Sequence, residues 1–270
     1  MELKDKTVIV TGGGNGLGRE LVLNLLSRGS SVIAIDISDA ALMETVKLSG
    51  DYSKMLKVYK LDITDRINVI NFADSLIKKV GPIDGLINNA GIIQPFKRVK
   101  DLDFVTIDRV FNVDFFGTLN LTKAFLPNLI ERSEAFIVNI SSMGGLFPVP
   151  GQSIYGAAKS AVKLLTEALQ AELDNTPVKV ILICPGGIET DIKFNSGLEK
   201  EKRKATEIKD SIIKPVKPSK AAEIIINSIE KNKAKVLIGT DIKMLNMIHK
   251  LSPRLASKLI ARQMESHIID

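Results

Sequence analysis

The chain has little of the chemistry on which several protein classes depend. Its 270 residues include one cysteine and two histidines, so an intrachain disulfide is impossible and a zinc site of cysteine and histidine is excluded. There is no tryptophan, and aromatic residues make up only 5%, which leaves few side chains on which nucleic-acid bases could stack. We therefore expect no metal centre and no nucleic-acid partner.

Long apolar runs are also missing. The sequence contains no stretch of about 18 uncharged apolar residues, which is the length that a membrane-spanning helix needs. The opening MELKDKTVIV lacks the apolar segment of a signal peptide. The formal charge of +6 is modest for this length. These features predict a cytoplasmic protein in a reducing compartment.

What the chain does contain is a regular alternation of apolar runs and amphipathic segments. The runs are continuous rather than alternating, which is typical of strands buried on both faces of a parallel sheet. We predict a doubly wound α/β fold of about seven strands, with residues 1–270 forming a single domain. The expected strands are Thr7–Val10, Ser31–Asp36, Met55–Leu61, Gly85–Asn88, Ala135–Ile140, Val178–Cys184 and Lys235–Ile238. The expected helices are Leu17–Ser27, Ala40–Leu48, Ile67–Lys79, Val105–Glu131, Ile154–Leu173 and Ser219–Lys231.

Two segments depart from this alternation. Residues 192–216 have no clear period and are long for a connection in an α/β fold, which suggests a lid over a site. Residues 241–270 form a helical tail broken at Pro253. A basic stripe in this tail (Arg254, Lys258, Arg262) lies beside apolar residues (Leu255, Leu259, Ile260). It could rest on an anionic membrane, but packing against the lid or a neighbouring subunit is the favoured interpretation.

A glycine-rich loop follows the first strand. Thr11 to Gly18 satisfy the pattern T-G-x-x-x-G-x-G, whereas the strict G-x-G-x-x-G pattern fails in every frame. Glycines let the backbone approach a pyrophosphate, and the amides of a helix N-terminus attract anions. A tight strand-to-helix turn would look similar, but the position after the first strand favours dinucleotide binding. The expected contacts are Gly12, Gly14, Asn15, Gly16, Leu17 and Gly18.

Asp36 ends the second strand, about 20 residues after this loop. Its carboxylate can accept hydrogen bonds from both ribose hydroxyls of an adenosine, whereas a 2′-phosphate would meet a negative charge. A solvated aspartate at a turn is the alternative. Because Ile37 rather than an arginine follows, the sequence favours NAD(H) over NADP(H).

Several further motifs occur in a fixed order. They are Asp62 after strand three, Asn88-Asn89-Ala90-Gly91 after strand four, Asn112 in the long helix, Ser142, Tyr155-Gly156-Ala157-Ala158-Lys159, and Pro185-Gly186-Gly187-Ile188-Glu189-Thr190. With the glycine loop, they make the sequence from Lys6 to Gly239 resemble the short-chain dehydrogenase/reductase family, in its branch of roughly 250 residues. The resemblance implies a Rossmann-type fold.

Tyr155 and Lys159 lie one helical turn apart, so their side chains share a face. An ammonium next to a phenol stabilises the phenolate, which would move the pKa of Tyr155 toward neutrality and suit it to proton transfer. Taken alone, a Tyr-x-x-x-Lys spacing is more often a solvated pair. The resemblance implies that Ser142 binds the reacting oxygen and that Asn112 holds a water beside the lysine, giving a tetrad of Asn112, Ser142, Tyr155 and Lys159.

The resemblance also assigns residues to the cofactor. Asp62 and Ile63 would lie at the adenine, Ile188 and Thr190 at the nicotinamide carboxamide, and Lys159 at the nicotinamide ribose. The remaining expected contacts are Asn89, Ala90, Gly91, Tyr155, Pro185 and Gly186.

These observations predict an enzyme that transfers a hydride between NAD(H) and a secondary alcohol or ketone. Two alternatives stay open: an NADPH-dependent 3-oxoacyl-thioester reductase, and a nucleotide-sensing scaffold without catalysis. An apolar or lipid-like small-molecule substrate is suggested by Phe194, Leu198, Ile208, Ile212 and Ile213 of the lid, with Leu146, Phe147 and Val149. The family is usually oligomeric, so a homodimer or homotetramer is expected.

Overall fold

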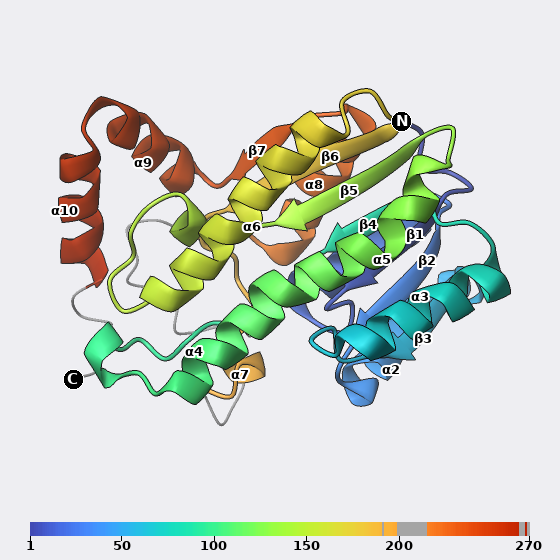
Figure 1. Cartoon of the computed structure of the whole chain (residues 1–270), viewed down its shortest axis with the longest axis horizontal. Helices are drawn as coiled ribbons and strands as arrows, with labels where there is room; N and C mark the ends of the chain where they lie inside the picture. The colour runs from blue at the N-terminus through green and yellow to red at the C-terminus, as the bar shows by residue number, and fades with distance from the viewer. Residues whose placement is uncertain (191, 199–214, 265–267, 269–270) are drawn as a thin grey trace.

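The computed structural model describes residues 1–190, 192–198, 215–264 and 268. Its centre is a sheet of seven parallel strands in the order β3-β2-β1-β4-β5-β6-β7 (Figure 1). The strand positions predicted from the apolar runs are confirmed, and the bounds differ by one residue at most. The strands are β1 (Thr7–Thr11), β2 (Ser31–Asp36), β3 (Leu56–Lys60), β4 (Gly85–Asn88), β5 (Ala135–Ile140), β6 (Val178–Pro185) and β7 (Lys235–Ile238).

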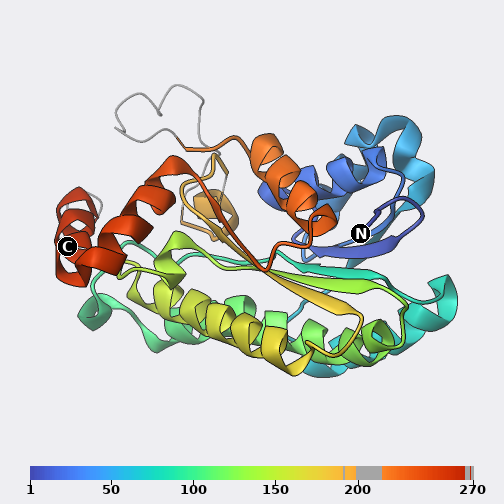
Figure 2. The ribbon, with the colours of Figure 1, turned by 90° about the horizontal axis from the view of Figure 1, so that it is seen from above.

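Helices cover both faces of the sheet, as Figure 2 shows edge-on. One face carries α1 (Gly16–Ser27), α2 (Asp39–Leu48) and α8 (Pro218–Glu230). The opposite face carries α3 (Arg66–Val80), α5 (Thr118–Ile130) and α6 (Ser153–Glu172). The doubly wound fold expected for continuous apolar strands is therefore confirmed.

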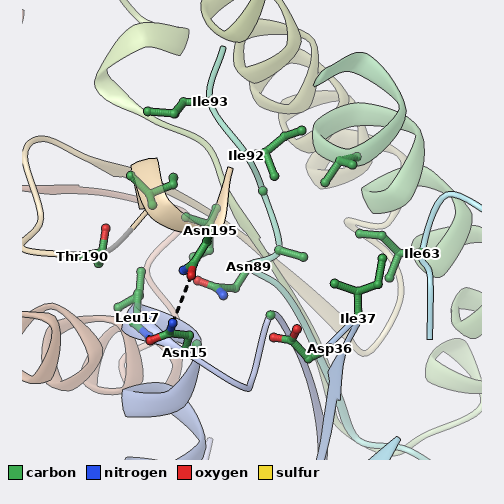
Figure 3. Close-up of a pocket in the computed structure, with 18 of the residues that line it drawn as sticks. Asn15, Leu17, Asp36, Ile37, Ile63, Asn89, Ile92, Ile93, Thr190 and Asn195 are labelled. Carbon is green, nitrogen blue, oxygen red and sulfur yellow. Dashed lines mark hydrogen bonds between the residues drawn. The ribbon is translucent and has the colours of Figure 1, made fainter. Parts of the chain in front are cut away.

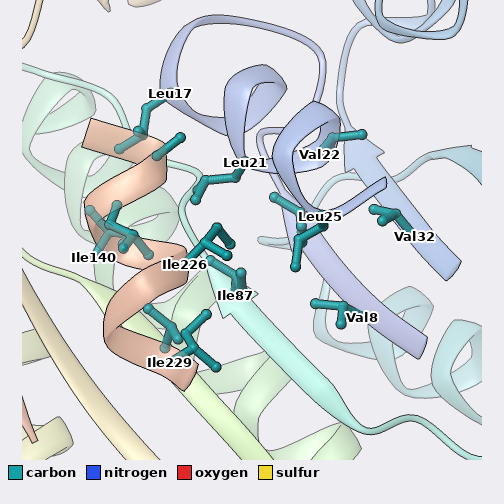
Figure 4. Close-up of a cluster of buried hydrophobic side chains, with 14 of the residues drawn as sticks. Val8, Leu17, Leu21, Val22, Leu25, Val32, Ile87, Ile140, Ile226 and Ile229 are labelled. Atoms are coloured by element: carbon teal, nitrogen blue, oxygen red, sulfur yellow. The ribbon is translucent and has the colours of Figure 1, made fainter. Parts of the chain in front are cut away.

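Alternate residues of each strand supply two cores. Val8 and Ile9 of β1 are both fully buried, but Val8 packs toward α1 and α8 whereas Ile9 packs toward α3 and α5. In the first core, Leu21 and Leu25 of α1 meet Ile226 of α8 above the strands (Figure 4). This burial on both faces fixes the carboxyl ends of the strands, where the site lies.

A third, smaller core joins the C-terminal helices to the sheet. Helices α9 (Thr240–Leu251) and α10 (Pro253–Met264) meet at Pro253, as the sequence predicted. Helix α10 contributes Ile260 to this core, which also contains Phe147 and the free Cys184 of β6. The basic stripe of α10 stays at its surface. Within the described residues, no helix is both long and apolar enough to cross a membrane.

The main difference from the sequence-based expectation concerns the predicted helix Val105–Glu131. It is divided into α4 (Phe104–Phe111), a π-helical turn at Asn112–Gly117, and α5. The wider turn is called the π segment below. Such segments often occur at functional sites because they change which side chains face inward.

Candidate active site

A cleft of about 1290 Å³ opens at the carboxyl ends of the strands. It lies where β1 and β4 are neighbours, because the strand order reverses at that point of the sheet. Every residue that the sequence analysis assigned to the site lines this cleft except Gly14, which is a buried residue of the glycine loop. Figure 3 shows part of the lining. We call the region around residues 11–18 and Asp36 the nucleotide end, and the region around Ser142, Tyr155 and Lys159 the catalytic end.

The glycine loop, residues 11–18, folds back on itself at the nucleotide end. Gly12 and Gly16 have φ values of +66° and +50°, a region that glycine adopts without strain. A Cβ on Gly18 would lie 1.9 Å from the carbonyl oxygen of Gly12. The Asn15 side chain accepts a hydrogen bond from the Gly16 amide (2.8 Å) and caps α1. The loop thus holds the N-terminus of α1 open toward the cleft.

Thr11 and Asn89 join this loop to the segment after β4. The Thr11 hydroxyl accepts hydrogen bonds from the amides of Asn89 and Ala90, both at 2.9 Å. The side-chain nitrogen Nδ2 of Asn89 donates a hydrogen bond to the Thr11 carbonyl oxygen, also at 2.9 Å. These bonds explain the Asn89-Ala90-Gly91 motif, because they fix the floor of the cleft.

Asp36 lies at the tip of β2 with its carboxylate directed over the glycine loop (Figure 3). One oxygen accepts from the Gly14 amide and the other from the Ser38 amide, each at 3.0 Å. Ile37 beside it is 64% exposed. An exposed carboxylate of α2, Glu44, lines the same end of the cleft, although the sequence analysis did not identify it.

The far walls carry the other predicted cofactor contacts. Ile63 is buried in the second core while it lines the cleft, and Asp62 is exposed, with Thr64 donating two hydrogen bonds to it. Pro185 ends β6, and Thr190 lies 3.3 Å from where a Cβ on Gly16 would stand. The walls therefore approach each other across the glycine loop.

A second bridge between the walls was not predicted. Asn15 donates a hydrogen bond to the side chain of Asn195 (3.1 Å) in the short helix α7, Ile192–Asn195 (Figure 3). Ile192 and Phe194 of α7 also line the cleft. The described part of the predicted lid thus borders the site; Ile208, Ile212 and Ile213 lie outside the described residues.

At the catalytic end, Ser142 follows β5 while Tyr155 and Lys159 lie in the first turns of α6. Lys159 is buried, its Nζ 5.9 Å from the centre of the Tyr155 ring. The same nitrogen donates to the Ile140 carbonyl oxygen (3.3 Å) at the end of β5. The three side chains that the sequence analysis placed in the site are thus brought together by two elements.

The electrostatics differ from the expectation that Lys159 alone would bring the pKa of Tyr155 toward neutrality. Burial raises the pKa of Tyr155 above its ordinary value. The Lys159 ammonium and a hydrogen bond with Ser142 act to lower it, while the carboxylate of Asp114 acts to raise it. The phenol therefore holds its proton more tightly than a free phenol does.

The residue beside Lys159 is Asp114 rather than the expected Asn112. Asn112 is exposed at the cleft and makes no hydrogen bond to Tyr155 or Lys159. Asp114, also in the π segment, is fully buried with its Oδ1 at 3.1 Å from the Lys159 Nζ. The sequence contained a signal for it, because Asp114 lies one helical turn after Val110 on the apolar stripe of this segment.

Gln94 is a second buried residue that the sequence analysis missed. Its Oε1 accepts hydrogen bonds from the amides of Ile154 (2.8 Å) and Tyr155 (3.0 Å), the otherwise unpaired donors of the first turn of α6. Its Nε2 donates to the Gly151 carbonyl oxygen (3.0 Å). Gln94 thus fastens the start of the helix that carries Tyr155.

Three apolar residues suggested for the substrate pack elsewhere. Phe147 is buried in the third core, and Leu146 and Val149 pack against that core. None of the three lines the cleft. Their apolar character is explained by the docking of α9 and α10.

Comparison with known proteins identifies the family. A sequence model of the short chain dehydrogenase family matches residues 6–201. SadH of Mycobacterium tuberculosis, whose name describes an oxidoreductase, is 36% identical over 260 residues, which cover 95% of this chain and 94% of that protein. The 3-oxoacyl-[acyl-carrier-protein] reductase FabG of Thermotoga maritima is 34% identical over 232 residues, covering 84% of this chain and 91% of that protein.

Solved structures share the fold. A short-chain dehydrogenase/reductase of Burkholderia phymatum, in complex with NAD, superposes with a TM-score of 0.80 at 23% identity, covering 93% of this chain and 96% of that one. Levodione reductase superposes with a TM-score of 0.79 at 26% identity, covering 87% and 96%. A short chain dehydrogenase of Burkholderia cenocepacia in complex with NADP gives 0.79 at 24% identity, covering 96% and 99%. The chain belongs to the short-chain dehydrogenase/reductase family, and is an oxidoreductase with a nucleotide-binding Rossmann fold.

Proposed function

We propose that the protein transfers a hydride between NAD(H) and a secondary alcohol or ketone, with an apolar or lipid-like molecule as its substrate. The observation that carries the proposal is one continuous cleft with an open helix N-terminus at one end and the Ser142, Tyr155 and Lys159 side chains at the other. A proton-transfer group and a nucleotide site so arranged suit reversible oxidation of an alcohol.

The residues at the nucleotide end fit a dinucleotide. Gly12, Gly16 and Gly18 carry no side chain, which would let a pyrophosphate approach the backbone of the loop, and a Cβ at Gly18 would collide with the Gly12 carbonyl oxygen. The two Asp36 oxygens suit the two hydroxyls of an adenosine ribose. Ile63 would contact the adenine, and Ile188 and Thr190 the nicotinamide carboxamide. When bound, the nicotinamide supplies or accepts the hydride.

The chain itself contributes orientation and proton transfer. Tyr155 gives its phenolic proton to a carbonyl oxygen during reduction and takes it back from the alcohol during oxidation. The Ser142 hydroxyl donates a hydrogen bond to the same oxygen and so orients it. Lys159 places a positive charge beside the phenol, which stabilises the phenolate that reduction leaves behind. Asn112 is exposed at the cleft, where its side chain could contact the substrate or the cofactor near the catalytic end.

Charge at the nucleotide end supports NAD(H). Asp36 and Glu44 would repel a 2′-phosphate, and Ile37 offers no cation to bind one. Arg19 also lines the cleft. Its guanidinium already donates hydrogen bonds to the Gly14 carbonyl oxygen (2.6 and 3.1 Å) and to the Thr45 hydroxyl (3.1 Å). A phosphate would have to compete with both.

The lining of the catalytic end supports an apolar substrate. Ile92 and Ile93 from the loop after β4, Ile192 and Phe194 from α7, and Val105 from α4 all face the cleft. Apolar walls with a few polar groups at one end are typical of small-molecule sites. Phe104 on α4 does not line the cleft and is 81% exposed, which supports association into a homodimer or homotetramer.

A second candidate is an NADPH-dependent 3-oxoacyl-thioester reductase, which the similarity to the Thermotoga maritima reductase favours. An acyl-carrier substrate would need cations at the mouth of the cleft, where Arg109 is exposed on α4. Asp108 beside it lines the same mouth and would offset that charge. We therefore rank this activity second.

The deciding experiment measures turnover on a panel of secondary alcohols, ketones and 3-oxoacyl thioesters with all four nicotinamide cofactors. We expect the highest kcat/KM for an apolar alcohol or ketone with NAD(H). Preference for a 3-oxoacyl thioester with NADPH would establish the second candidate. Dinucleotide binding without turnover of any substrate would instead indicate a nucleotide-sensing scaffold.

A further inference from the structure

Asp114 is a carboxylate in a place where a neutral amide was expected. The family resemblance placed an asparagine beside the lysine, yet the side chain that contacts the Lys159 ammonium is Asp114. It is fully buried, and its environment is closed by α6 and the loop after β4. Burial raises the pKa of Asp114, while the Lys159 ammonium and the Ile92 amide act to lower it, so the carboxylate depends on these contacts for its charge.

The contacts of Asp114 are specific. Oδ1 lies 3.1 Å from the Lys159 Nζ and accepts a hydrogen bond from the Ile92 amide at 3.2 Å. Oδ2 is buried and has no hydrogen-bond partner among the described residues. Gly91 makes room for the pair, since a Cβ there would lie 2.5 Å from Oδ1 and 2.9 Å from the Lys159 Nζ.

The π segment holds the carboxylate in this position. The Asp114 carbonyl oxygen accepts a hydrogen bond from the Thr118 hydroxyl at 3.0 Å. Asp114 is therefore fixed at both its backbone and its side chain, while Asn112 in the same turn stays exposed. The geometry is that of a fixed counter-ion, because the lysine and the carboxylate cannot separate without opening the core.

We propose that Asp114 is a positioning residue that holds the Lys159 ammonium and offsets its charge at the Tyr155 hydroxyl. This inference rests on the proposed function for its catalytic meaning, although the charge interaction can be measured without it. A neutral side chain at this position would leave the full lysine charge acting on the phenol. The carboxylate makes the tyrosine a weaker acid and its phenolate a stronger base.

Among the described residues, few other titratable groups lie on the elements packed against α6. Of the elements packed against α6, the π segment contributes Asp114, α4 contributes Asp108 and Arg109 at the exposed mouth, and β6 contributes the Cys184 thiol. The charges that act on Tyr155 are those of Lys159 and Asp114, in opposite directions. The Asp114 charge also raises the pKa of Lys159, against the lowering effect of burial. The pKa of Lys159 is thus raised above its ordinary value, and the lysine holds its proton more tightly than a free amine does.

The chain offers a direct measurement. It has three tyrosines and no tryptophan, so the ultraviolet absorbance of tyrosinate reports Tyr52, Tyr59 and Tyr155 alone. Subtracting the titration of Tyr155→Phe from that of the wild type isolates Tyr155. The same subtraction for Asp114→Asn uses the double variant Asp114→Asn/Tyr155→Phe. Asp74→Asn, which removes an exposed carboxylate of α3, serves as the matched control.

We expect the Tyr155 midpoint in Asp114→Asn to fall by about one pH unit or more relative to the wild type, and Asp74→Asn to leave it unchanged. An unchanged or higher midpoint in Asp114→Asn overturns the proposal, and would mean that Asp114 is itself protonated. Asp114→Ser provides a second neutral variant should the amide not fold.

This titration needs neither substrate nor cofactor, so it separates the two proposals. A lowered midpoint in a protein that turns over no alcohol would support the counter-ion and refute the dehydrogenase activity. In an active enzyme, the pH at which alcohol oxidation reaches half its maximum should fall in Asp114→Asn by the same amount as the midpoint of Tyr155. An unshifted pH profile alongside a shifted phenol would show that Tyr155 is not the catalytic base.

Discussion

The two ends of the cleft are built in different ways. At the nucleotide end, the shape comes from the backbone: positive φ angles at Gly12 and Gly16, and the absence of a Cβ at Gly18. At the catalytic end it comes from buried charged and polar side chains, notably Lys159 and Asp114. The comparison suggests that the first end is sensitive to volume and the second to charge and hydrogen bonding.

The largest expected effect is that of Tyr155→Phe, which should change turnover but not cofactor binding. Tyr155→Phe removes only a hydroxyl at the catalytic end, so kcat should fall by about 10²–10⁴-fold while the protein folds and binds NADH as before. Steady-state kinetics on the best alcohol and a fluorescence titration with NADH measure the two quantities. Near wild-type kcat would remove Tyr155 from the proposed machinery.

A single methyl group tests the nucleotide end. In Gly18→Ala the new Cβ must move away from the Gly12 carbonyl oxygen, so we expect a loss of about 1–3 kcal/mol of stability and weaker NADH binding. Gly144→Ala is the matched control, because its Cβ would lie 3.6 Å from the Tyr155 ring, an ordinary contact. Urea unfolding and NADH titration of both variants check this. Equal behaviour of the two would contradict the role given to volume.

Hydrogen bonding at the catalytic end is tested through Gln94. In Gln94→Leu the amides of Ile154 and Tyr155 lose their acceptor, which should cost about 1–3 kcal/mol of stability and also lower kcat. Gln170→Leu removes comparable side-chain bonds, to the carbonyl oxygens of Val180 and Ala234, far from the cleft. Gln170→Leu should therefore lower the stability of the protein and leave kcat unchanged. A kcat loss in both variants would show that the effect is not specific to α6.

The smallest expected effect concerns charge at the nucleotide end. Asp36→Ala should narrow the preference for NADH over NADPH by about tenfold, since it removes one repulsive carboxylate. Comparing kcat/KM for the two cofactors measures it. Glu44→Ala should act in the same direction and less strongly, because that side chain is exposed. A wild-type preference for NADPH would refute the cofactor assignment.

Much of the fold could be predicted from sequence because it depends on local patterns. Continuous apolar runs located all seven strands, and the glycine spacing located the loop that lines the nucleotide end. The division of Val105–Glu131 could not be predicted in this way. No proline marks the π segment, and the ion pair that it makes through Asp114 is with Lys159, which lies far along the chain.

The residues that were missed share a property. Gln94 and Asp114 are buried polar side chains in a loop and a helix, where a polar residue is ordinarily taken to face solvent. Their partners lie far along the chain: Gln94 bonds the start of α6, and Asp114 pairs with Lys159. Only the assembled fold shows that such residues are satisfied inside the protein rather than by water.

The reactivity of the buried Cys184 thiol can report local unfolding of the third core. Burial raises the pKa of its thiol to about 11, so it should be unreactive while the third core is closed. Its reaction rate with a disulfide reagent therefore counts the events in which α9 and α10 leave the sheet. If that rate exceeds the rate of global unfolding, the C-terminal helices open as a separate cooperative unit while the sheet stays folded.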